Sequence, residues 1–178
     1  MATSGTTTFD LSIEEIIQEA YERCGMATTS GYSLRSARTS LNLLFAEWAN
    51  RGIHLWKVSL NENLLVSGQA EYAVDGNVSD VLEAFVSTTA AAANSVNTQD
   101  VSLTKIDRSA YAALPNKLAL GQPSQYYVDR QEIPKIYLYQ APDLNTYTYL
   151  KYYVIKRIED AGAYTNDADI VFRFLPCM

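Results

Sequence analysis

A chain of 178 residues with 48% hydrophobic and 19% charged residues has ordinary globular composition and is long enough for one or two compact domains. The formal charge of −6 and the sequence pI of about 4.8 argue against a protein that grips nucleic acid, because that affinity comes mainly from Lys and Arg neutralising phosphates. The sequence has neither a basic start followed by an apolar core nor a run of about 18 apolar residues, so we expect no signal peptide and no membrane contact.

Two amphipathic helices are predicted after a Thr- and Ser-rich arm. Ser12 and Glu15 have the spacing of a capping box, apolar residues then recur at intervals of three and four, and Gly25 supplies a stop. A second helix is predicted from near Ser33 to Gly52 on the same kind of spacing. Because the linker between them is short, the two helices should be antiparallel neighbours in an αα-hairpin.

From Ile53 onward the apolar period changes to two, and Val, Thr, Tyr and Ile become frequent between regularly spaced turn residues. This pattern is typical of a β-sandwich or a small barrel. The small-residue segment TTAAAANSVNTQ (88–99) is expected at an exposed hairpin tip, and residues 108–114 can form one helical turn. The predicted strands are 55–60, 62–66, 70–74, 81–88, 100–106, 124–130, 134–140 and 146–157.

A third helix is predicted after Gly162, with Asp167 or Asp169 as its N-cap. The apolar side of this helix would be exposed to water on its own, so we expect the helix to dock on the αα-hairpin. We also expect the native protein to continue beyond this sequence. The predicted fold class is α+β, an α-helical hairpin core with a C-terminal helix, interrupted by an antiparallel β-sandwich or barrel-like insertion. The predicted domains are 1–54 for the N-terminal arm and αα-hairpin, 55–160 for the β insertion, and 161–178 for the C-terminal helix returning to the helical core.

No catalytic or cofactor motif is recognisable, so we expect a protein that is not an enzyme and that holds no cofactor and no metal. His54 is the single histidine, interpreted as a boundary residue, and Cys24 and Cys177 are expected to be buried thiols too distant in sequence for a zinc motif. No glycine pair has phosphate-loop spacing. Acidic groups at 75–80 and 160–169 are interpreted as turn and cap residues rather than calcium ligands. A carboxylate pair of the glycosidase kind stays possible, because its separation is a spatial quantity.

Eight of the thirteen tyrosines lie between Tyr126 and Tyr153. In the last two predicted strands, tyrosines alternate with aliphatic residues, so both faces are apolar or amphipathic. Either the sheet is covered on both sides within the subunit, or one face contacts another protein, which is the interpretation we favour. The segment YLKYYVIKR also has the look of a single-strand nucleic-acid surface, which the acidic charge disfavours. The predicted protein-interface residues are Ala90, Ala91, Ala92, Ala93 and Asn94 at the hairpin tip, and Tyr137, Tyr139, Tyr147 and Tyr149 in the strands.

Three segments together carry a resemblance to a known family. LRSARTSLNLLFAEWANRGIHLWKV (34–58) resembles the second helix and following strand of head-to-tail adaptors of tailed bacteriophages, the family that includes tail tubular protein A and related connector subunits. LSIEEIIQEAYERCGM (11–26) looks like the family's opening helix. IDRSAYAALPNKLALGQPSQYYVDRQEIPKIYLYQAPD (106–143) looks like its short helix, Gly-x-Pro turn and two strands. In the first segment the resemblance is carried by Leu41, Leu44, Glu47, Trp48, Gly52, Ile53 and Trp56.

This resemblance implies a structural virion protein at the head–tail junction, made in the host cytoplasm. It would form a homo-oligomeric ring, a dodecamer of about twelve copies, that joins the portal protein to tail nozzle or tail-tube proteins and takes part in tail assembly. Genomic DNA would pass through the lumen, part of the DNA ejection channel, without sequence-specific binding, and acidic subunits would repel it. Family members usually extend the third helix into a tail, which this sequence does not show. The alternative is a carbohydrate-binding or tail-fibre-type β module, which leaves the αα-hairpin unexplained.

Overall fold

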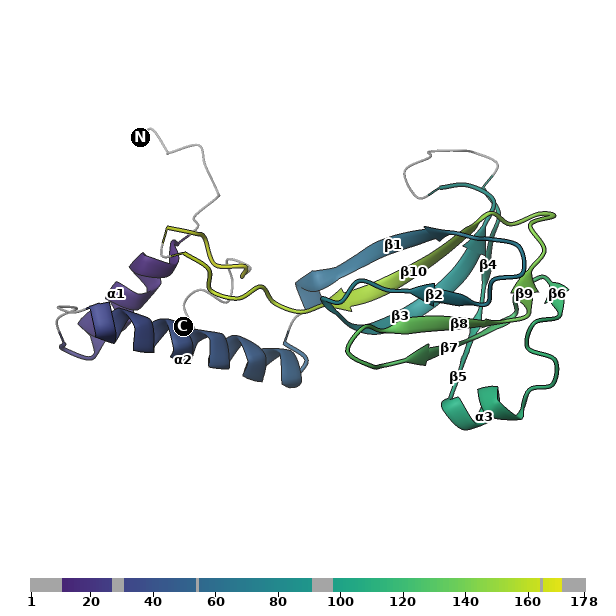
Figure 1. Cartoon of the computed structure of the whole chain (residues 1–178). Coiled ribbons are helices and arrows are strands. Elements are labelled where there is room, and N and C mark those ends of the chain that lie inside the picture. The colour runs from purple at the N-terminus through teal and green to yellow at the C-terminus, as the bar shows by residue number, and fades with distance from the viewer. Residues whose placement is uncertain (1–10, 27–30, 54, 91–97, 164, 171–178) are drawn as a thin grey trace, which may run out of the picture. The chain divides into compact units, whose positions relative to one another are not determined.

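The computed structural model describes residues 11–26, 31–53, 55–90, 98–163 and 165–170. The chain divides into two compact units, which we call the helical unit (Met1–Trp56 with Ile158–Met178) and the β unit (Lys57–Arg157). Figure 1 labels the elements. In chain order they are α1 (Ile13–Arg23), α2 (Gly31–Asn50), a 3-10 turn (Leu55–Lys57), β1 (Val58–Leu64), β2 (Glu71–Ala73), β3 (Val78–Ser87), β4 (Asp100–Ser102), β5 (Thr104–Ile106), α3 (Arg108–Ala113), β6 (Leu120–Gly121), β7 (Gln125–Asp129), β8 (Lys135–Tyr139), β9 (Ala141–Pro142) and β10 (Tyr149–Lys156).

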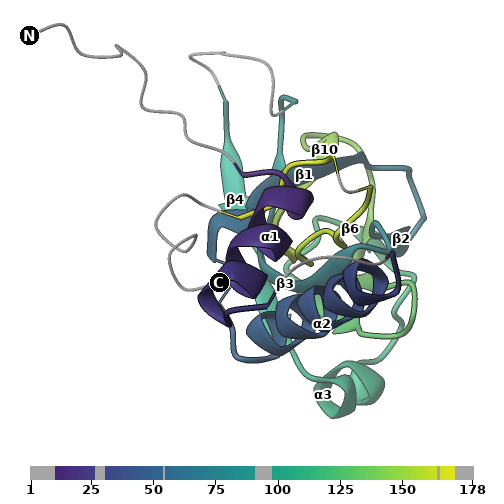
Figure 2. The same cartoon turned by 90° about the vertical axis from the view of Figure 1, so that its left-hand side faces the viewer.

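The start and the end of α1 follow from local interactions. The Glu15 N–H donates to Ser12 Oγ at 3.3 Å, and the Glu15 carboxylate accepts from the Ser12 N–H at 2.9 Å, so the predicted capping box is confirmed. Gly25 closes the helix with a φ of 68°, and the next N–H, that of Met26, returns to the Tyr21 carbonyl at 3.0 Å. Figures 1 and 2 both show α1 beside α2. The core of the helical unit comprises Ile13, Ile17, Leu41, Phe45, Ile158 and Ala161.

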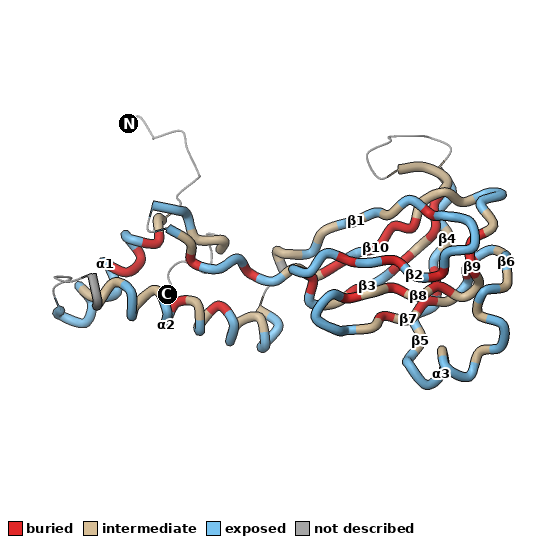
Figure 3. The backbone as a smooth tube through the Cα atoms, in the orientation of Figure 1, coloured by how far each residue is buried: buried red, intermediate tan, exposed pale blue. Residues whose placement is uncertain are grey.

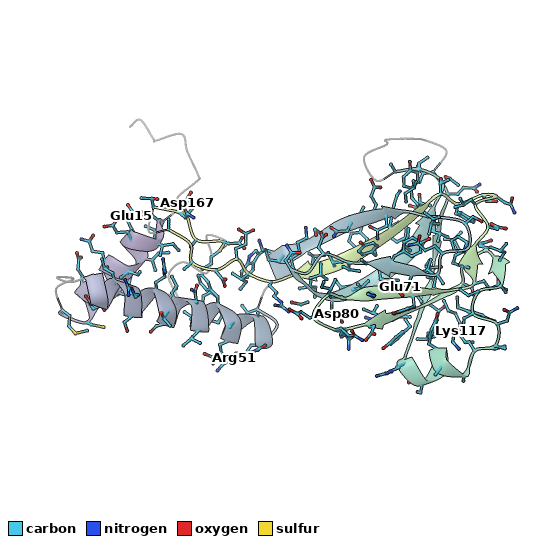
Figure 4. The ribbon with its side chains drawn as sticks, in the orientation of Figure 1. Glu15, Arg51, Glu71, Asp80, Lys117 and Asp167 are labelled. Atoms are coloured by element: carbon cyan, nitrogen blue, oxygen red, sulfur yellow. The ribbon has the colours of Figure 1, made fainter. Side chains whose placement is uncertain are left out.

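The predicted C-terminal helix is absent from the described residues, where 158–163 and 165–170 form no helix. The two acidic residues expected as N-caps are used elsewhere: Asp169 accepts from the Glu159 N–H at 3.0 Å, and Asp167 forms a β-bridge with Ser12. Figure 4 shows Asp167 close to Glu15 at the start of α1. The Ala161 N–H donates to Asn42 Oδ1 at 2.7 Å, so side chains as well as backbone hold this segment in place. Residues 171–178 lie outside the described residues.

The predicted fold class is therefore wrong. Strands make up 35% of the chain and helices 26%, and the arrangement is not an α-helical hairpin core with a C-terminal helix. The physical reason is where burial occurs. Although α2 is 20 residues long, Leu41 and Phe45 are its only fully buried side chains among those described. Most of the buried apolar side chains belong instead to the β unit.

The β unit contains two four-stranded sheets, with strand orders β1-β10-β3-β4 and β2-β8-β7-β5, and a small β6-β9 pair. Most pairings are antiparallel, but β5 runs parallel to β7 and β6 parallel to β9, so the insertion is not purely antiparallel. The chain crosses between sheets at Leu103, whose N–H donates to the Ala84 carbonyl at 2.9 Å. This residue separates β4, which pairs with β3, from β5, which pairs with β7.

The main core lies between the two sheets, and buried positions alternate with outward ones along the strands in Figure 3. Two tyrosines are part of it: Tyr126 is 1% exposed and Tyr152 is 2% exposed. Burial, with smaller effects from nearby carboxylates, raises the pKa of each hydroxyl to about 12. The core comprises Leu65, Tyr72, Val74, Val78, Val81, Ala84, Val86, Leu103, Tyr126, Val128, Ile136, Leu138, Leu150, Tyr152 and Val154.

An ion cluster around Asp80, which is labelled in Figure 4, links the two sheets of the β unit. Asp80 of β3 accepts from Arg130 Nε at 3.1 Å and from its terminal nitrogen at 2.9 Å, and it lies 3.4 Å from Lys105 Nζ. Burial raises the pKa of Asp80, but the hydrogen bonds and charge of Arg130 and the charge of Lys105 outweigh it and hold the pKa below its ordinary value. Lys105 also donates to the Val81 carbonyl at 2.5 Å. The carboxylate is therefore engaged in joining strands of different sheets.

Candidate protein interface on the β unit

The edge strand β1 has its apolar residues on the outward side of the sheet. Its exposure alternates along the strand, and Val58, Leu60 and Leu64 are 39%, 38% and 61% exposed. Glu62 is the fourth residue on this exposed side, and the residues that alternate with these four, Ser59, Asn61 and Asn63, are polar and less exposed. This is the reverse of the usual pattern, in which the apolar side of an edge strand faces the core.

The two asparagines explain the reversal. Asn63 donates to the Ala73 carbonyl of β2 at 3.0 Å and accepts from the Tyr152 hydroxyl at 3.2 Å. Asn61 donates to the Asp75 carboxylate at 3.3 Å. These bonds join the edge of one sheet to the neighbouring edge of the other and satisfy a buried tyrosine, so the asparagines must face inward. Because side chains alternate along a strand, the apolar residues of β1 then face outward.

The outward apolar residues continue across the sheet. The register places Leu60 opposite Tyr153, and the Tyr153 and Phe85 ring centroids lie 6.1 Å apart. At the centre lies Lys151, which is 5% exposed and pairs with Asp100 at 3.8 Å. Its aliphatic stem is covered by neighbours while its charge stays paired. We call this surface the β10 face, and it comprises Val58, Leu60, Leu64, Phe85, Tyr149, Lys151, Tyr153 and Ile155.

The other sheet presents a second aromatic surface. The rings of Tyr127 on β7 and Tyr137 on β8 stack with centroids 6.0 Å apart, and Tyr111 of α3 stacks on Tyr127 at 5.6 Å. Tyr139 shares the outward side of β8 with Tyr137 and is half-buried. We call this surface the tyrosine face, and it comprises Tyr111, Tyr127, Tyr137 and Tyr139.

Local interactions hold α3 over this surface. Asp107 is its N-cap and accepts from the Ala110 N–H at 2.7 Å. Lys117 donates to the Leu114 carbonyl at 3.0 Å, beyond the other end of the helix, and its Nζ lies 5.5 Å from the centroid of the Tyr111 ring. The short helix is thereby fixed at both ends, which places Tyr111 against the sheet.

Charged residues border the tyrosine face. Lys135 donates to Glu71 at 2.5 Å, and this hydrogen bond lowers the pKa of Glu71 from its ordinary value. Burial raises the pKa of the Tyr137 hydroxyl, and the Glu71 charge acts in the same direction. Figure 4 marks Glu71 and Lys117 on the β unit. The surface thus combines stacked rings with charges of both signs, a composition that suits protein recognition.

The structure separates the tyrosines predicted for the interface. Tyr137 and Tyr139 lie on the tyrosine face, Tyr149 lies on the β10 face, and Tyr147 is half-buried against the core. Ala90 is half-buried next to a closed hairpin base, where the Thr89 and Thr98 hydroxyls lie 2.8 Å apart. Ala91, Ala92, Ala93 and Asn94 lie outside the described residues, as does His54.

Sequence reasoning missed the apolar residues of β1 and the contributions of Phe85, Tyr111 and Tyr153. The alternation VSLNENL was a usable signal for β1, since it shows two chemically different sides. Which side faces out depends on the bond from Tyr152 to Asn63, and these residues are 89 positions apart. That information is not local, so the pattern alone does not identify the face.

The helical unit has a separate apolar groove of about 330 Å³ between α1 and α2. Cys24 lines it and is exposed, so the prediction that this cysteine is buried was wrong. Cys177 lies outside the described residues. The remaining lining residues are Ile16, Ile17, Ala20, Tyr21, Met26, Ala37, Ser40, Leu41 and Leu44.

Metal and membrane sites find no support in the part of the chain that the structure describes. There, no group of three or more His, Cys, Asp or Glu side chains is placed to hold a metal ion. None of the described helices has the length and hydropathy needed to cross a membrane. Comparison with known proteins finds no match, either to a protein-family model or to a curated sequence. The features of the structure that bear on function are therefore the β10 face and the tyrosine face.

Proposed function

We propose that this chain is a non-enzymatic structural subunit of a tailed-phage virion, the head-to-tail adaptor that forms a ring of about twelve copies between portal and tail. The observation that carries the proposal is the β10 face, where an edge strand directs its apolar residues outward. Apolar side chains exposed together on one face of a sheet mark a protein contact rather than a solvated face, even with Glu62 and Lys151 among them. The occupant we assign to it is a neighbouring copy of the same chain.

Two further observations support this role. The helical unit is built from both ends of the chain and the β unit from its middle, an arrangement in keeping with the adaptor family that segments of the sequence resemble. Each copy carries a formal charge of −6, so the subunits around a ring lumen would repel the phosphates of DNA. A genome could then pass through the lumen without binding to its wall. Neither observation requires catalytic chemistry.

The size of the β10 face predicts a weak contact. β1 has seven residues, so the face is about 23 Å long, and four strands span about 14 Å, which corresponds to about 320 Å² on each copy. Stable interfaces bury about 800 Å² per partner. Like charge on every copy further opposes association. An isolated subunit should therefore be monomeric or weakly associated, and a ring should form where the portal holds neighbours at high effective concentration.

The test is to mix the purified subunit with its portal and follow the mass by light scattering across a salt series. We expect ring-sized complexes only with portal present, and more of them as salt screens the repulsion between subunits over distances beyond about 8 Å. Leu60→Ser should reduce ring formation, whereas Leu43→Ser, which changes a 67% exposed leucine of α2 outside both faces of the β unit, should not. A subunit that stays monomeric with portal at every salt concentration contradicts the adaptor role. A stable ring of the subunit alone at low salt contradicts the need for a template.

The carbohydrate-binding or tail-fibre-type alternative predicts a different result. It requires tyrosine rings that can stack on sugar rings, whereas Tyr111, Tyr127 and Tyr137 already stack on one another. Binding to immobilised glycans that is lost in Tyr139→Ala would favour that alternative.

A further inference from the structure

The β10 face and the tyrosine face lie on opposite outer sides of the β unit. Each is the outward side of one of the two sheets that enclose the main core. Tyr153 and Phe85 lie on one side, and Tyr127 and Tyr137 lie on the other. A single subunit therefore presents two surfaces rich in aromatic residues, pointing away from each other.

We infer that these two faces bind each other in neighbouring copies, so that each subunit contacts one neighbour through its β10 face and the next through its tyrosine face. The inference rests on the proposed ring. Head-to-tail contacts between two different faces generate a ring when the rotation between neighbouring copies closes, whereas a face that binds its own copy produces a closed dimer. Pairing two β10 faces would also leave both tyrosine faces uncovered.

Charge argues against pairing two β10 faces. The outward side of that sheet carries Glu62, Glu83 and Asp100, and the cation among its strand residues is Lys151, which gives a formal charge of −2. Asp80, opposite Ile155, is left out of this count because Arg130 and Lys105 neutralise it. Two such faces in contact would oppose like charges, which costs affinity.

The tyrosine face avoids this repulsion. Apart from Arg130, which is paired with Asp80, its border carries three cations and three carboxylates, which balance to a formal charge of zero. Its cations lie on β8, at the start of α3 and just beyond that helix, where they can face the carboxylates of a neighbouring β10 face. The six residues are Arg108, Lys117 and Lys135 with Glu71, Asp107 and Asp129.

The two faces also fit in chemistry. Leu60 and Leu64 provide aliphatic surface at the edge of the β10 face, and the stacked tyrosines provide flat rings with hydroxyl groups. Aromatic residues of this kind are enriched at contacts because they combine large area with a polar tip. Burying aliphatic side chains against rings removes more apolar surface from water than pairing two partly polar tyrosine faces.

The test is a complementation experiment without portal. Leu60→Lys disables the β10 face, and Tyr139→Lys disables the tyrosine face. Each variant is first checked for a melting temperature close to that of the wild type, and Leu64→Lys or Arg108→Glu replaces one that does not fold. Association is measured by sedimentation velocity up to about 0.5 mM, a range that detects contacts with dissociation constants near 1 mM.

We expect the wild type to associate progressively with concentration and each variant alone to associate at least about tenfold more weakly, because each substitution places an unpaired lysine charge in the contact. An equimolar mixture of the two variants should form 1:1 dimers and nothing larger, because only one intact pair of faces remains. The inference is overturned if either variant alone still dimerises with wild-type affinity, if the mixture stays monomeric, or if the wild type never associates. Dimers in the mixture together with no portal binding would contradict the adaptor role and leave the face pairing intact.

Discussion

The inward asparagines of β1 lead to a quantitative prediction. Replacing Asn63 by alanine removes the donor to the Ala73 carbonyl at 3.0 Å and the acceptor for the Tyr152 hydroxyl at 3.2 Å. Tyr152 is 2% exposed, so its hydroxyl would have little access to water, and the side chain of Asn61 is the nearby group left to bond with it. Each lost hydrogen bond is worth about 1 kcal/mol and an unsatisfied buried hydroxyl about 1–3 kcal/mol. We therefore expect Asn63→Ala to lower the free energy of unfolding by about 2–4 kcal/mol.

The partner variant tests the mechanism. Tyr152→Phe removes the hydroxyl itself and should cost about 1 kcal/mol, because it leaves no buried donor behind. In the double variant the costs should add to less than the sum of the single costs, with a coupling of about 1 kcal/mol or more. Urea unfolding followed by near-UV circular dichroism of the tyrosines reports on the β unit, whereas both tryptophans lie in the helical unit.

A matched control lies next in the sequence. Leu64→Ala changes a 61% exposed residue of the same strand and should cost less than about 1 kcal/mol. In an edge strand whose leucines face the core, replacing leucine by alanine would lower the free energy of unfolding more than replacing asparagine by alanine. If Leu64→Ala destabilises the β unit more than Asn63→Ala does, the inward placement of the asparagines is refuted, and with it the β10 face.

Two other predictions concern stability. The pKa of Asp80 is lower in the folded protein than in the unfolded chain. The ionised carboxylate therefore contributes its full stabilisation when the pH is above the unfolded-state pKa, and this contribution is lost as the pH falls through the folded-state pKa. Asp80→Asn should thus cost about 1–2 kcal/mol at pH 7 and less at pH 3, measured by urea unfolding, and equal costs at both pH values would contradict this. Phe45→Ala should cost about 3–4 kcal/mol, because Phe45 is 3% exposed. Trp48→Ala should lower the free energy of unfolding by less, because Trp48 is half-buried. Unfolding followed by the helical circular dichroism signal measures both costs, and a larger cost for Trp48→Ala than for Phe45→Ala would contradict this prediction.

Elements that depend on neighbours in sequence could be predicted. The capping box at Ser12 and Glu15 and the stop at Gly25 involve residues within one turn of α1, so the helix ends could be read from the order of residues. The alternation of apolar and polar residues placed strands near most of the observed ones for the same reason. The predicted third helix was wrong because the carboxylate of Asp169 and the backbone of Asp167 find partners elsewhere in the helical unit.

Local spacing and composition are enough to predict the helical start of this chain and its long β region with tyrosine-rich strands. Which side of β1 faces outward depends instead on long-range contacts, because the hydrogen bond from Tyr152 to Asn63 joins strands far apart in the sequence. The tertiary structure also brings Tyr111 of α3 onto the rings of β7 and β8, which no sequence period anticipates. The candidate interface therefore depends on hydrogen bonds and stacking between distant segments, and long-range contacts of this kind form only when the two sheets enclose their core.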